Sequence, residues 1–332
     1  MDEEKRKAYI AASFGSSPKK RCEDADRINA ARPVVDEKYL TKLEKSGISV
    51  VTREDFQYPH SFLDLYEPPV LFYAKGDLAL LETTCVTMVG TRRATRYGVE
   101  ATEYFAKGLA EAGVTIVSGL ASGIDAIAHK AALKCGGKTI GIAACGLDKK
   151  YPPENAELIE EVGQNGLLLS EYPLGTPPLA FRFPERNRLL AAISKGVLVT
   201  EAGVGSGALI TADLALDLGR ELWLVPGSIF SRSSEGCNER LKECGRLVTR
   251  IGDIIYDTGG KDDGLNRTQI YTPEEQKLID ILEREGRAHY TAIAANSDLS
   301  IEEVAKLLMK MELDGKVRRL SGNYYVVANY GI

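Results

Sequence analysis

Short apolar runs alternate with amphipathic segments through the middle of the chain. Gly, Ser or Pro bound most of the runs, as in buried strands, and the segments between them repeat their apolar residues at helical spacing. The strands predicted in this way are Cys85–Val89, Thr115–Ser118, Thr139–Ala144, Leu167–Ser170, Val197–Glu201, Leu222–Val225 and Leu247–Arg250. The helices predicted between them are Tyr97–Glu111, Ile124–Leu133, Pro153–Gln164, Pro184–Ile193, Gly207–Leu218 and Glu235–Glu243. This alternation predicts an α/β fold, a mainly parallel sheet with helices on both faces.

Four further segments flank the predicted sheet domain, which we place at residues 81–257. They are a polar leader at 1–35, a short segment at 36–80, a polar, glycine-rich linker at 258–270 and a small domain at 271–330. The leader has no sustained apolar period, so we expect it to be mobile or loosely helical and to carry no function. The aromatic and aliphatic residues of the second segment are expected to pack it onto the main domain.

The small C-terminal domain has the pattern of a winged helix. Two capping boxes, Thr272–Glu275 and Ser300–Glu303, each open a helix, and a hairpin with its turn at Ser321–Gly322 follows. With a short helix between them, these elements resemble a winged helix, a relative of the helix-turn-helix. The predicted recognition helix mixes acidic and basic residues. We therefore expect contact with a protein, or an accessory contact with DNA, rather than sequence-specific DNA binding.

Charge is unevenly distributed along the chain. The net charge of −5 counts against a general nucleic-acid binder, because affinity for phosphate comes mainly from clustered Lys and Arg. Two segments, residues 91–97 and residues 181–195, are nonetheless basic. Their basic residues are Arg92, Arg93 and Arg96 in the first and Arg182, Arg186, Arg188 and Lys195 in the second. Two basic clusters on an acidic body predict a local groove rather than a uniformly basic surface.

Several classes of protein are excluded by what the sequence lacks. No apolar run reaches the roughly 18 residues of a membrane span, and the start of the chain lacks the apolar core of a signal peptide. We expect a soluble, cytoplasmic protein with no membrane partner. Six cysteines without a CxxC pair and three scattered histidines predict neither disulfides nor a metal site. The dinucleotide and P-loop motifs are absent, which argues against an ordinary dehydrogenase or NTPase, and no cofactor is predicted.

The stretch Phe181–Gly207 combines cations, aromatic residues and a glycine-rich turn. The turn, Gly203–Gly207, follows a predicted strand, and its missing side chains would let an anion approach the N–H groups of the next helix. Other strands also end in small residues, among them Gly90 and Ser118–Gly119. Because sites in open α/β sheets lie at the carboxyl ends of the strands, these turns predict one crevice lined with N–H donors.

Longer motifs stand in a fixed order along the central domain. They are VGTRRATRYG at 89–98, VSGLASGIDAIAHKAAL at 117–133, LLLSEYP at 167–173, FPERNRLLAAIS at 183–194, VTEAGVGSGALITADLALDLGR at 199–220, VPGSIF at 225–230 and EGCNERLKECG at 235–245. In these motifs the chain resembles the DprA family of bacterial DNA-processing proteins, also called Smf. The resemblance implies a Rossmann-like domain that binds single-stranded DNA without reading its sequence. It also implies a homodimer that helps load RecA onto the strand during natural transformation.

The resemblance assigns DNA binding to residues of the first turn, of the FPERNR stretch and of the small-residue turns. With the lysine of the second basic cluster added, the predicted DNA-binding residues are Arg92, Ser118, Gly119, Phe183, Arg186, Asn187, Arg188, Lys195, Ser206 and Gly207. No catalytic residue and no metal ligand is predicted.

One candidate residue and one residue pair have other interpretations. Arg188 also fits a buried countercharge for Glu171 or Glu201, since carboxylates at neighbouring strand ends need one. Asp125 and His129 are spaced as a catalytic pair on one helix, but a helix cap and a packed histidine account for them more simply.

Two alternative hypotheses for the function use the same crevice. DprA domains also resemble nucleotide-cleaving phosphoribohydrolases, in which Glu201 and Arg188 would act on the glycosidic bond. The PGGxGTxxE turn of that group is absent, and Glu201 precedes the glycines instead of following them. A nucleotide-sensing domain, with a small ligand in the crevice and a partner on the winged helix, is the third hypothesis.

Overall fold

The computed structural model describes residues 3–26, 35–258, 271–314 and 316–327. The chain divides into two compact units, residues 1–261 and residues 262–332, and each is considered by itself. The first unit contains the predicted sheet domain, and the second contains the small C-terminal domain.

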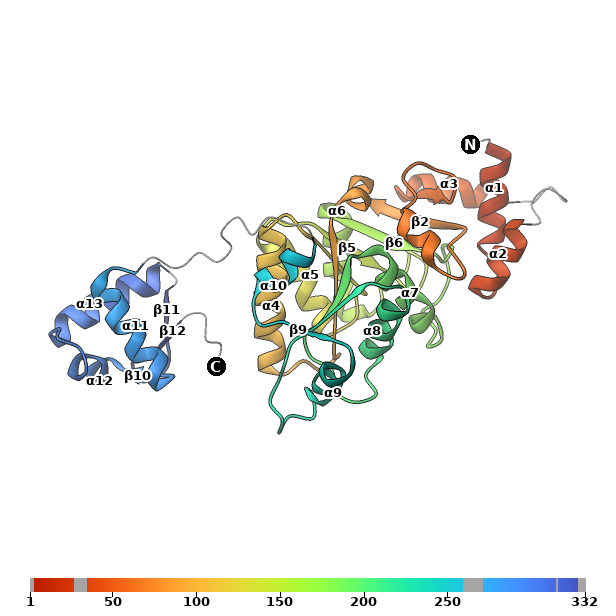
Figure 1. Cartoon of the computed structure of the whole chain (residues 1–332). Coiled ribbons are helices and arrows are strands. Elements are labelled where there is room, and N and C mark those ends of the chain that lie inside the picture. The colour runs from red at the N-terminus through yellow and green to blue at the C-terminus, as the bar shows by residue number, and fades with distance from the viewer. Residues whose placement is uncertain (1–2, 27–34, 259–270, 315, 328–332) are drawn as a thin grey trace. The chain divides into compact units, whose positions relative to one another are not determined.

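A sheet of nine strands runs through the described part of the first unit (Figure 1). Its strands are β1 (Ser49–Thr52), β2 (Leu71–Gly76), β3 (Cys85–Val89), β4 (Thr115–Ser118), β5 (Thr139–Ile142), β6 (Leu167–Ser170), β7 (Gly196–Val199), β8 (Glu221–Leu224) and β9 (Arg246–Leu247). Their order across the sheet is β1-β2-β6-β5-β4-β3-β7-β8-β9. From β6 to β9 all neighbours are parallel, whereas β2 is antiparallel to β6 and β1 to β2.

The strand order reverses at β3. From β3 the chain winds outward through β4, β5 and β6, and it then returns to place β7 on the other side of β3. This is the topological switch point of a doubly wound sheet, and ligands of such folds bind in the crevice outside the carboxyl ends of the strands there. The topology therefore marks the edge at which β3 and β7 end.

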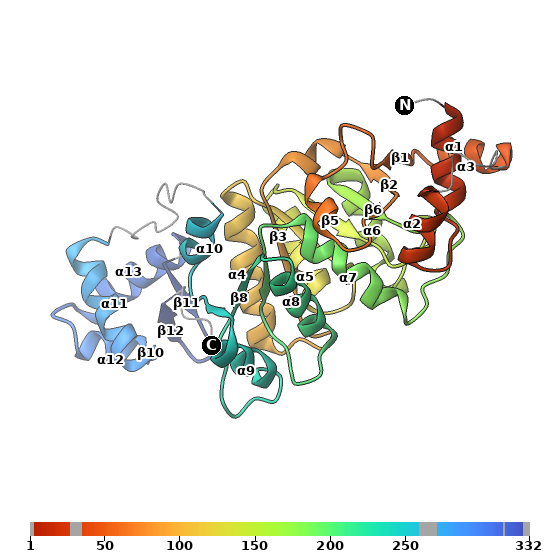
Figure 2. The ribbon, with the colours of Figure 1, turned by 45° about the vertical axis from the view of Figure 1, so that its right-hand side comes forward.

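Helices cover both faces of the sheet (Figures 1 and 2). They are α4 (Arg96–Glu111), α5 (Ile124–Lys134), α6 (Ala156–Asn165), α7 (Arg182–Ile193), α8 (Gly207–Asp217), α9 (Glu235–Glu243) and α10 (Ile251–Asp257). α4 packs against α5 and α10, and α7 packs against α8. Strands β3 to β7 are buried along their whole length, as expected for parallel strands between two helix layers. The predicted α/β class, Rossmann-like with helices on both faces, is confirmed.

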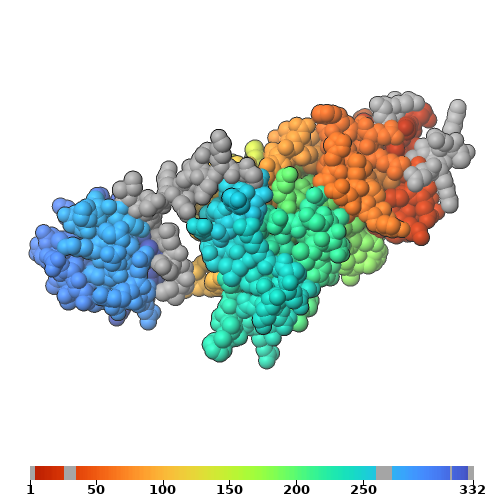
Figure 3. Space-filling model, in the orientation of Figure 1, coloured from red at the N-terminus to blue at the C-terminus, as the bar shows by residue number. Residues whose placement is uncertain are grey.

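Residues 36–80 join the sheet instead of only packing onto it. β2 follows a proline-rich stretch, and its residues pair with β6 in the register Tyr73↔Ser170 to Gly76↔Leu167. In the space-filling view, the orange atoms of residues 36–80 form a continuous surface with the green atoms of the main sheet (Figure 3). The boundary that we placed near residue 80 therefore runs through one continuous body.

Some elements of the main domain have their predicted bounds. They are the strands Thr115–Ser118 and Leu167–Ser170 and the helix Glu235–Glu243.

The leader was expected to be mobile or loosely helical, and for residues 3–26 the mobile interpretation is wrong. These residues form α1 (Glu3–Ala12) and α2 (Pro18–Asp26), and α3 (Glu37–Lys45) follows. Tyr9 and Ile10 are buried, and Ser13 Oγ lies 2.8 Å from Tyr73 Oη of β2. Residues 27–34 lie outside the described residues. The leader escaped the sequence pattern because its buried positions are few and stand among charged residues.

The second unit has the elements of a winged helix. They are α11 (Pro273–Glu285), β10 (Ala288–His289), α12 (Tyr290–Ala295), α13 (Ile301–Leu313), β11 (Val317–Arg319) and β12 (Tyr324–Val327). Both predicted capping boxes form: the Thr272 and Ser300 side chains each accept from the N–H of the glutamate three residues on. The predicted linker, apart from Thr258, lies outside the described residues.

Candidate functional site

A cleft of about 530 Å³ opens at the carboxyl ends of β3 and β7. Gly90 and Arg92, which follow β3, form one wall, and Ser206 and Gly207 at the start of α8 form another. The first turns of α7, including Phe183, close a third side. The cleft therefore lies at the switch point that the strand order marks.

A smaller hollow of about 160 Å³ adjoins the cleft. Arg92, Tyr151 and Phe183 line both. The Arg92 guanidinium lies over the Phe183 ring, with Cζ 5.4 Å from the ring centroid, and the Tyr151 ring is 5.8 Å from that of Phe183. A cation held on an aromatic face keeps its charge, and Arg92 is exposed and forms no ion pair within the described part of the chain. This group offers both a charge for phosphate and ring faces for bases.

The start of α8 provides N–H groups on the opposite wall. Ser206 is the N-cap residue of the helix, and its side chain accepts from the N–H of Ala208. Gly205 has a φ of +76°, which favours glycine, and a Cβ added at Gly207 would meet nothing within 4 Å. The positive end of the helix is thus open to an anion in the cleft. Ser206 and Gly207 thus line the crevice that the sequence predicted at the carboxyl ends of the strands.

Arg186 borders the cleft but is buried beneath it. Its Nη1 donates to the carbonyl oxygen of Gly119, at 2.6 Å, and to that of Ile142, and its Nε donates to Asn187 Oδ1 at 3.2 Å. Burial lowers the pKa of Arg186, and burial likewise raises the pKa of the neighbouring Asp125 carboxyl. We expected Arg186 to hold phosphate. The structure instead gives it backbone partners at the ends of β4 and β5, where it supports the floor of the cleft beside Asn187.

Ser118 and Gly119 were expected to offer donors to an anion, and their groups are already engaged. Ser118 is wholly buried, and its Oγ donates to the carbonyl oxygen of Met88 at 2.6 Å. The Gly119 N–H donates to Asp125 Oδ2 at 3.1 Å. A Cβ at Gly119 would lie 2.6 Å from Arg186 Nη2, so the glycine is needed for the close approach of that guanidinium. Both residues are part of the support of the cleft.

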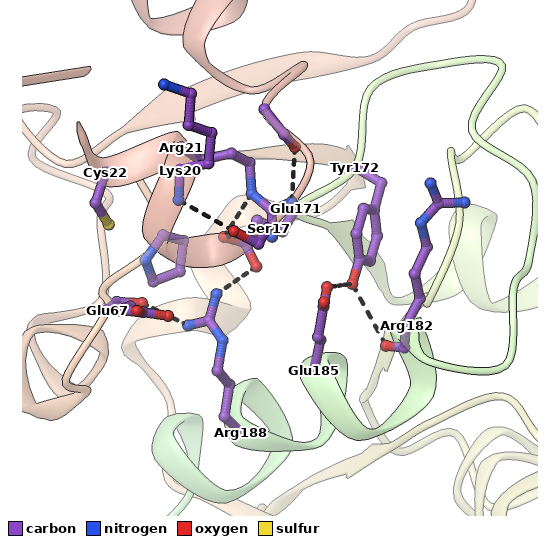
Figure 4. Close-up of polar contacts among 12 residues, drawn as sticks. Ser17, Lys20, Arg21, Cys22, Glu67, Glu171, Tyr172, Arg182, Glu185 and Arg188 are labelled. Carbon is purple, nitrogen blue, oxygen red and sulfur yellow. Dashed lines mark hydrogen bonds and ion pairs between the residues drawn. The ribbon is translucent and has the colours of Figure 1, made fainter. Parts of the chain in front are cut away.

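Arg188 takes the second of its two predicted roles (Figure 4). Its Nη2 lies 2.5 Å from Glu171 Oε2, and its Nη1 donates to the carbonyl oxygen of Glu67 at 2.8 Å. Arg21 of α2 binds the other carboxylate oxygen, with Nη2 3.2 Å from Glu171 Oε1. Arg188 does not line the cleft. Its countercharge is Glu171, not Glu201.

Lys195 lies at the other edge of the sheet. It precedes β7, and its N–H donates to the carbonyl oxygen of Cys85, the first residue of β3. Its side chain is exposed at the amino ends of the parallel strands, whereas the cleft is at their carboxyl ends. The expectation that Lys195 joins the basic groove was wrong, because helix α7 begins at the cleft and carries the chain back to the opposite edge of the sheet before Lys195.

Glu201 holds Thr95, the N-cap residue of α4. Its carboxylate accepts from the N–H of Thr95 at 2.8 Å and from Thr95 Oγ1 at 2.6 Å, at the start of α4. It is 1% exposed and does not line the cleft. The enzymatic hypothesis required Glu201 and Arg188 in one site, and their partners hold them in different ones.

Asp125 and His129 do not form a catalytic pair. Asp125 accepts from the N–H groups of Gly119 and Ala121 in the turn before α5. His129 is wholly buried, and its Nδ1 lies 2.6 Å from Thr139 Oγ1. Burial, together with the nearby Arg186 charge, lowers the pKa of His129 to about 3. Asp125 holds the turn, and His129 is the packed histidine that the simpler interpretation expected.

Two residues that shape the site were missed by reasoning from the sequence. Tyr151 stands in the loop after β5, and its exposed ring could have been suspected from its place beyond a strand end. Arg21 carries no such signal, because it comes from a distant part of the chain and only the fold brings it to Glu171.

Comparisons with known proteins agree with this architecture. Residues 49–259 match the family described as DNA recombination-mediator protein A, and residues 267–323 match the DprA winged helix domain. DNA processing protein DprA of Streptococcus pneumoniae is 42% identical over 223 residues, 67% of this chain and 78% of that protein. Protein Smf of Escherichia coli is 35% identical over 301 residues, 87% of this chain and 80% of that protein.

Two solved structures are similar to this fold. DprA from Streptococcus pneumoniae superimposes with a TM-score of 0.64 at 39% identity, covering 75% of this chain and 86% of that one. DprA from Helicobacter pylori, a structure described as giving insight into its unique single-stranded DNA binding mode, has a TM-score of 0.58 at 36% identity. That match covers 63% of this chain and 94% of that one.

Proposed function

The chain belongs to the DNA recombination-mediator protein A family, to which the DNA processing proteins DprA and Smf belong, and from this premise we propose that it binds single-stranded DNA without reading the sequence. The observation that carries the proposal is the arrangement around the cleft: Arg92 over the Phe183 ring on one side, and the start of α8 at Ser206 and Gly207 on the other. Rings for bases and positive charge for phosphates are what sequence-tolerant binding of a single strand requires.

A single strand suits this site better than a duplex. Stacking on Phe183 or Tyr151 needs the face of an unpaired base, and in a duplex those faces are covered. Base-specific recognition of a duplex uses a helix or ribbon in the major groove, and the residues of the cleft come from loops and helix starts at a sheet edge. The Helicobacter pylori relative, described by its single-stranded DNA binding mode, supports the same choice.

The acidic balance of the chain limits the binding surface to its basic part. The net charge is −5, whereas Arg92 and Arg93 are both exposed beside the cleft. Phosphates held by these side chains release counterions, so binding weakens as salt rises. Because the chain as a whole is acidic, we expect the strand to bind at this basic edge of the sheet.

The wider role that we propose follows the family. The bound strand is protected and passed to RecA in natural transformation and recombination, with the chain acting as a homodimer in the cytoplasm. Its relatives are named as DNA processing proteins, which supports a place in this process. Faster assembly of RecA on an oligonucleotide in the presence of this protein is the expected result.

The binding function proposed here includes no metal and no cofactor. Residues 3–26, 35–258, 271–314 and 316–327 contain no group of three His, Cys, Asp or Glu side chains that could hold a metal ion. In the same residues, no helix has both the length and the apolar composition to cross a membrane.

Fluorescence anisotropy of labelled oligonucleotides tests the proposal. At one salt concentration, a single strand is expected to bind more tightly than the duplex of the same length, with little difference between unrelated sequences. Equal affinity for the two forms would contradict it. As a check on the enzymatic hypothesis, incubation with nucleoside monophosphates is expected to release no free base.

A further inference from the structure

The loop between β8 and α9, residues 225–234, lies next to the cleft on the same edge of the sheet. β8 pairs with β7 in parallel, so the two strands end together. Strand neighbours are about 4.8 Å apart, which places the end of β8 roughly 10 Å from the end of β3, where Arg92 begins one wall of the cleft. The loop therefore lies along this edge beside the turn that leads to Ser206.

Hydrogen bonds hold the base of this loop. The Gly227 N–H donates to Asn238 Oδ1 at 3.2 Å, and Asn238 Nδ2 donates back to the Gly227 carbonyl oxygen at 3.0 Å. Tyr97 Oη donates to the Pro226 carbonyl oxygen at 2.5 Å. At the far side, a Cβ on Gly203 would lie 2.9 Å from the Arg232 carbonyl oxygen, so the loop rests on the turn that leads to Ser206.

At its tip this anchored loop presents two large apolar side chains to solvent. Phe230 is 92% exposed and Ile229 is 84% exposed, and the loop projects beside α9 (Figure 1). Arg232 is also exposed, and it forms no ion pair among the described residues. Phe230 and Arg232 thus place an aromatic ring and a cation two residues apart on one loop, and these are the residue types that Phe183 and Arg92 bring to the cleft.

We propose that the loop 225–234 extends the DNA-binding site, with Phe230 stacking on a base and Arg232 contacting phosphate of the nucleotides that leave the cleft. The inference rests on the proposed single-strand function of the cleft. A single strand is the occupant that fits, because the loop continues the edge on which cation, ring and helix start already lie. A base stacked on Phe230 also covers apolar surface that is otherwise left in water.

Phe230→Trp gives a direct readout. Trp223, the single tryptophan of the chain, is 0% exposed, so an indole at position 230 reports on a surface that the native fluorescence does not see. Oligothymidylates of about 4 to 16 nucleotides span the site sizes common for single-strand binders. The emission of Phe230→Trp is expected to be quenched once the oligonucleotide is longer than the cleft alone can hold. Phe56→Trp, 90% exposed near the end of β1 at the other end of the sheet order, is the matched control and is expected to stay unquenched.

Binding of the same series completes the test. Phe230→Ala is expected to weaken binding of the longer oligonucleotides about tenfold and to leave the shortest unaffected. Arg232→Gln should reduce the salt slope by about one for the longer ones only. Tight binding by the parent together with unquenched emission of the Phe230→Trp variant would overturn this inference alone, whereas no binding by the parent would overturn the proposed function with it. A change of oligomeric state in Phe230→Ala would assign the loop to an interface between copies and would also overturn it.

Discussion

Arg21, in the N-terminal helix α2, forms a buried ion pair with Glu171, which follows β6 and lies 150 residues later in the chain. The two side chains are 2% and 3% exposed, with Arg21 Nη2 3.2 Å from Glu171 Oε1. The Arg21 guanidinium also lies over the ring of Tyr172, 5.2 Å from its centroid. The Glu171 carboxylate thus ties the leader to the end of β6. Arg188 of α7 binds the other oxygen of the same carboxylate (Figure 4).

Removal of Arg21 should destabilise the first unit. Arg21→Ala leaves Glu171 buried with one partner fewer, and breaking a buried pair in this way costs about 3–5 kcal/mol of unfolding free energy. Urea denaturation measures it. Lys20→Ala, next in the chain and paired with Asp24 on the surface, is the control and should change the stability by less than about 1 kcal/mol. Equal losses of unfolding free energy for the two substitutions would show that the buried pair stabilises the fold no more than the surface pair does.

Arg92 and Phe183 should separate the two components of DNA binding. Arg92→Gln is expected to weaken binding by about 1–3 kcal/mol and to reduce the salt slope by about one, because a charged contact to phosphate is lost. Phe183→Ala should cost about the same and leave the slope unchanged, since lost stacking releases no counterions. Titrations at several salt concentrations measure both. Lys195→Gln, at the opposite edge, serves as the control and should bind as the parent does.

Arg186 should affect stability more than Arg92 does. Arg186→Ala removes the donors to the Gly119 and Ile142 carbonyl oxygens and leaves Asp125 without its nearby cation. We expect a loss of about 3 kcal/mol or more of unfolding free energy, against no measurable loss for the exposed Arg92→Gln. Thermal unfolding of the two variants makes the comparison. An Arg186→Ala protein that melts like the parent would return this residue to the list of direct phosphate ligands.

His129 should make the protein acid-sensitive. Its pKa falls from 6.5 to about 3 on folding, so below pH 6.5 the unfolded chain binds a proton that the folded chain excludes. The contribution of His129 to the free energy of unfolding is therefore fully present above about pH 6.5. It is lost as the pH falls toward 3, by up to about 1.4 kcal/mol per pH unit. His129→Gln should flatten the dependence of unfolding free energy on pH between about 6.5 and 4.5. His60→Gln, on the surface, is the control. For each variant, the slope of unfolding free energy against pH is compared with that of the parent.

Chelation should leave DNA binding unchanged. In the function that we propose, the strand is held by a guanidinium, ring faces and backbone N–H groups that line the cleft, and none of these needs a metal. Anisotropy titrations with and without a chelator are expected to coincide. A stoichiometric metal that survives dialysis, and whose removal weakens binding, would contradict this.

The order of strands and helices could be predicted from the sequence because their signals are local. Wholly buried strands such as Leu167–Ser170 appear as short apolar runs, and the capping boxes at Thr272 and Ser300 depend on residues three apart. The glycine-rich turn before α8 was predicted for the same reason, since Gly205 needs a positive φ that the sequence itself signals.

The roles of the charged residues were decided by the tertiary structure. Arg186, Arg188 and Lys195 stand within ten positions of one another, yet one is buried on carbonyl oxygens, one is paired with Glu171 and one lies at the far edge of the sheet. The free energy of a charge depends on its desolvation and on partners that come from distant segments, and neither is encoded in its neighbours along the chain. The sequence determined where the crevice would form. Which cations reach it, and that the leader is held to the sheet through Arg21, followed only from how the chain packs.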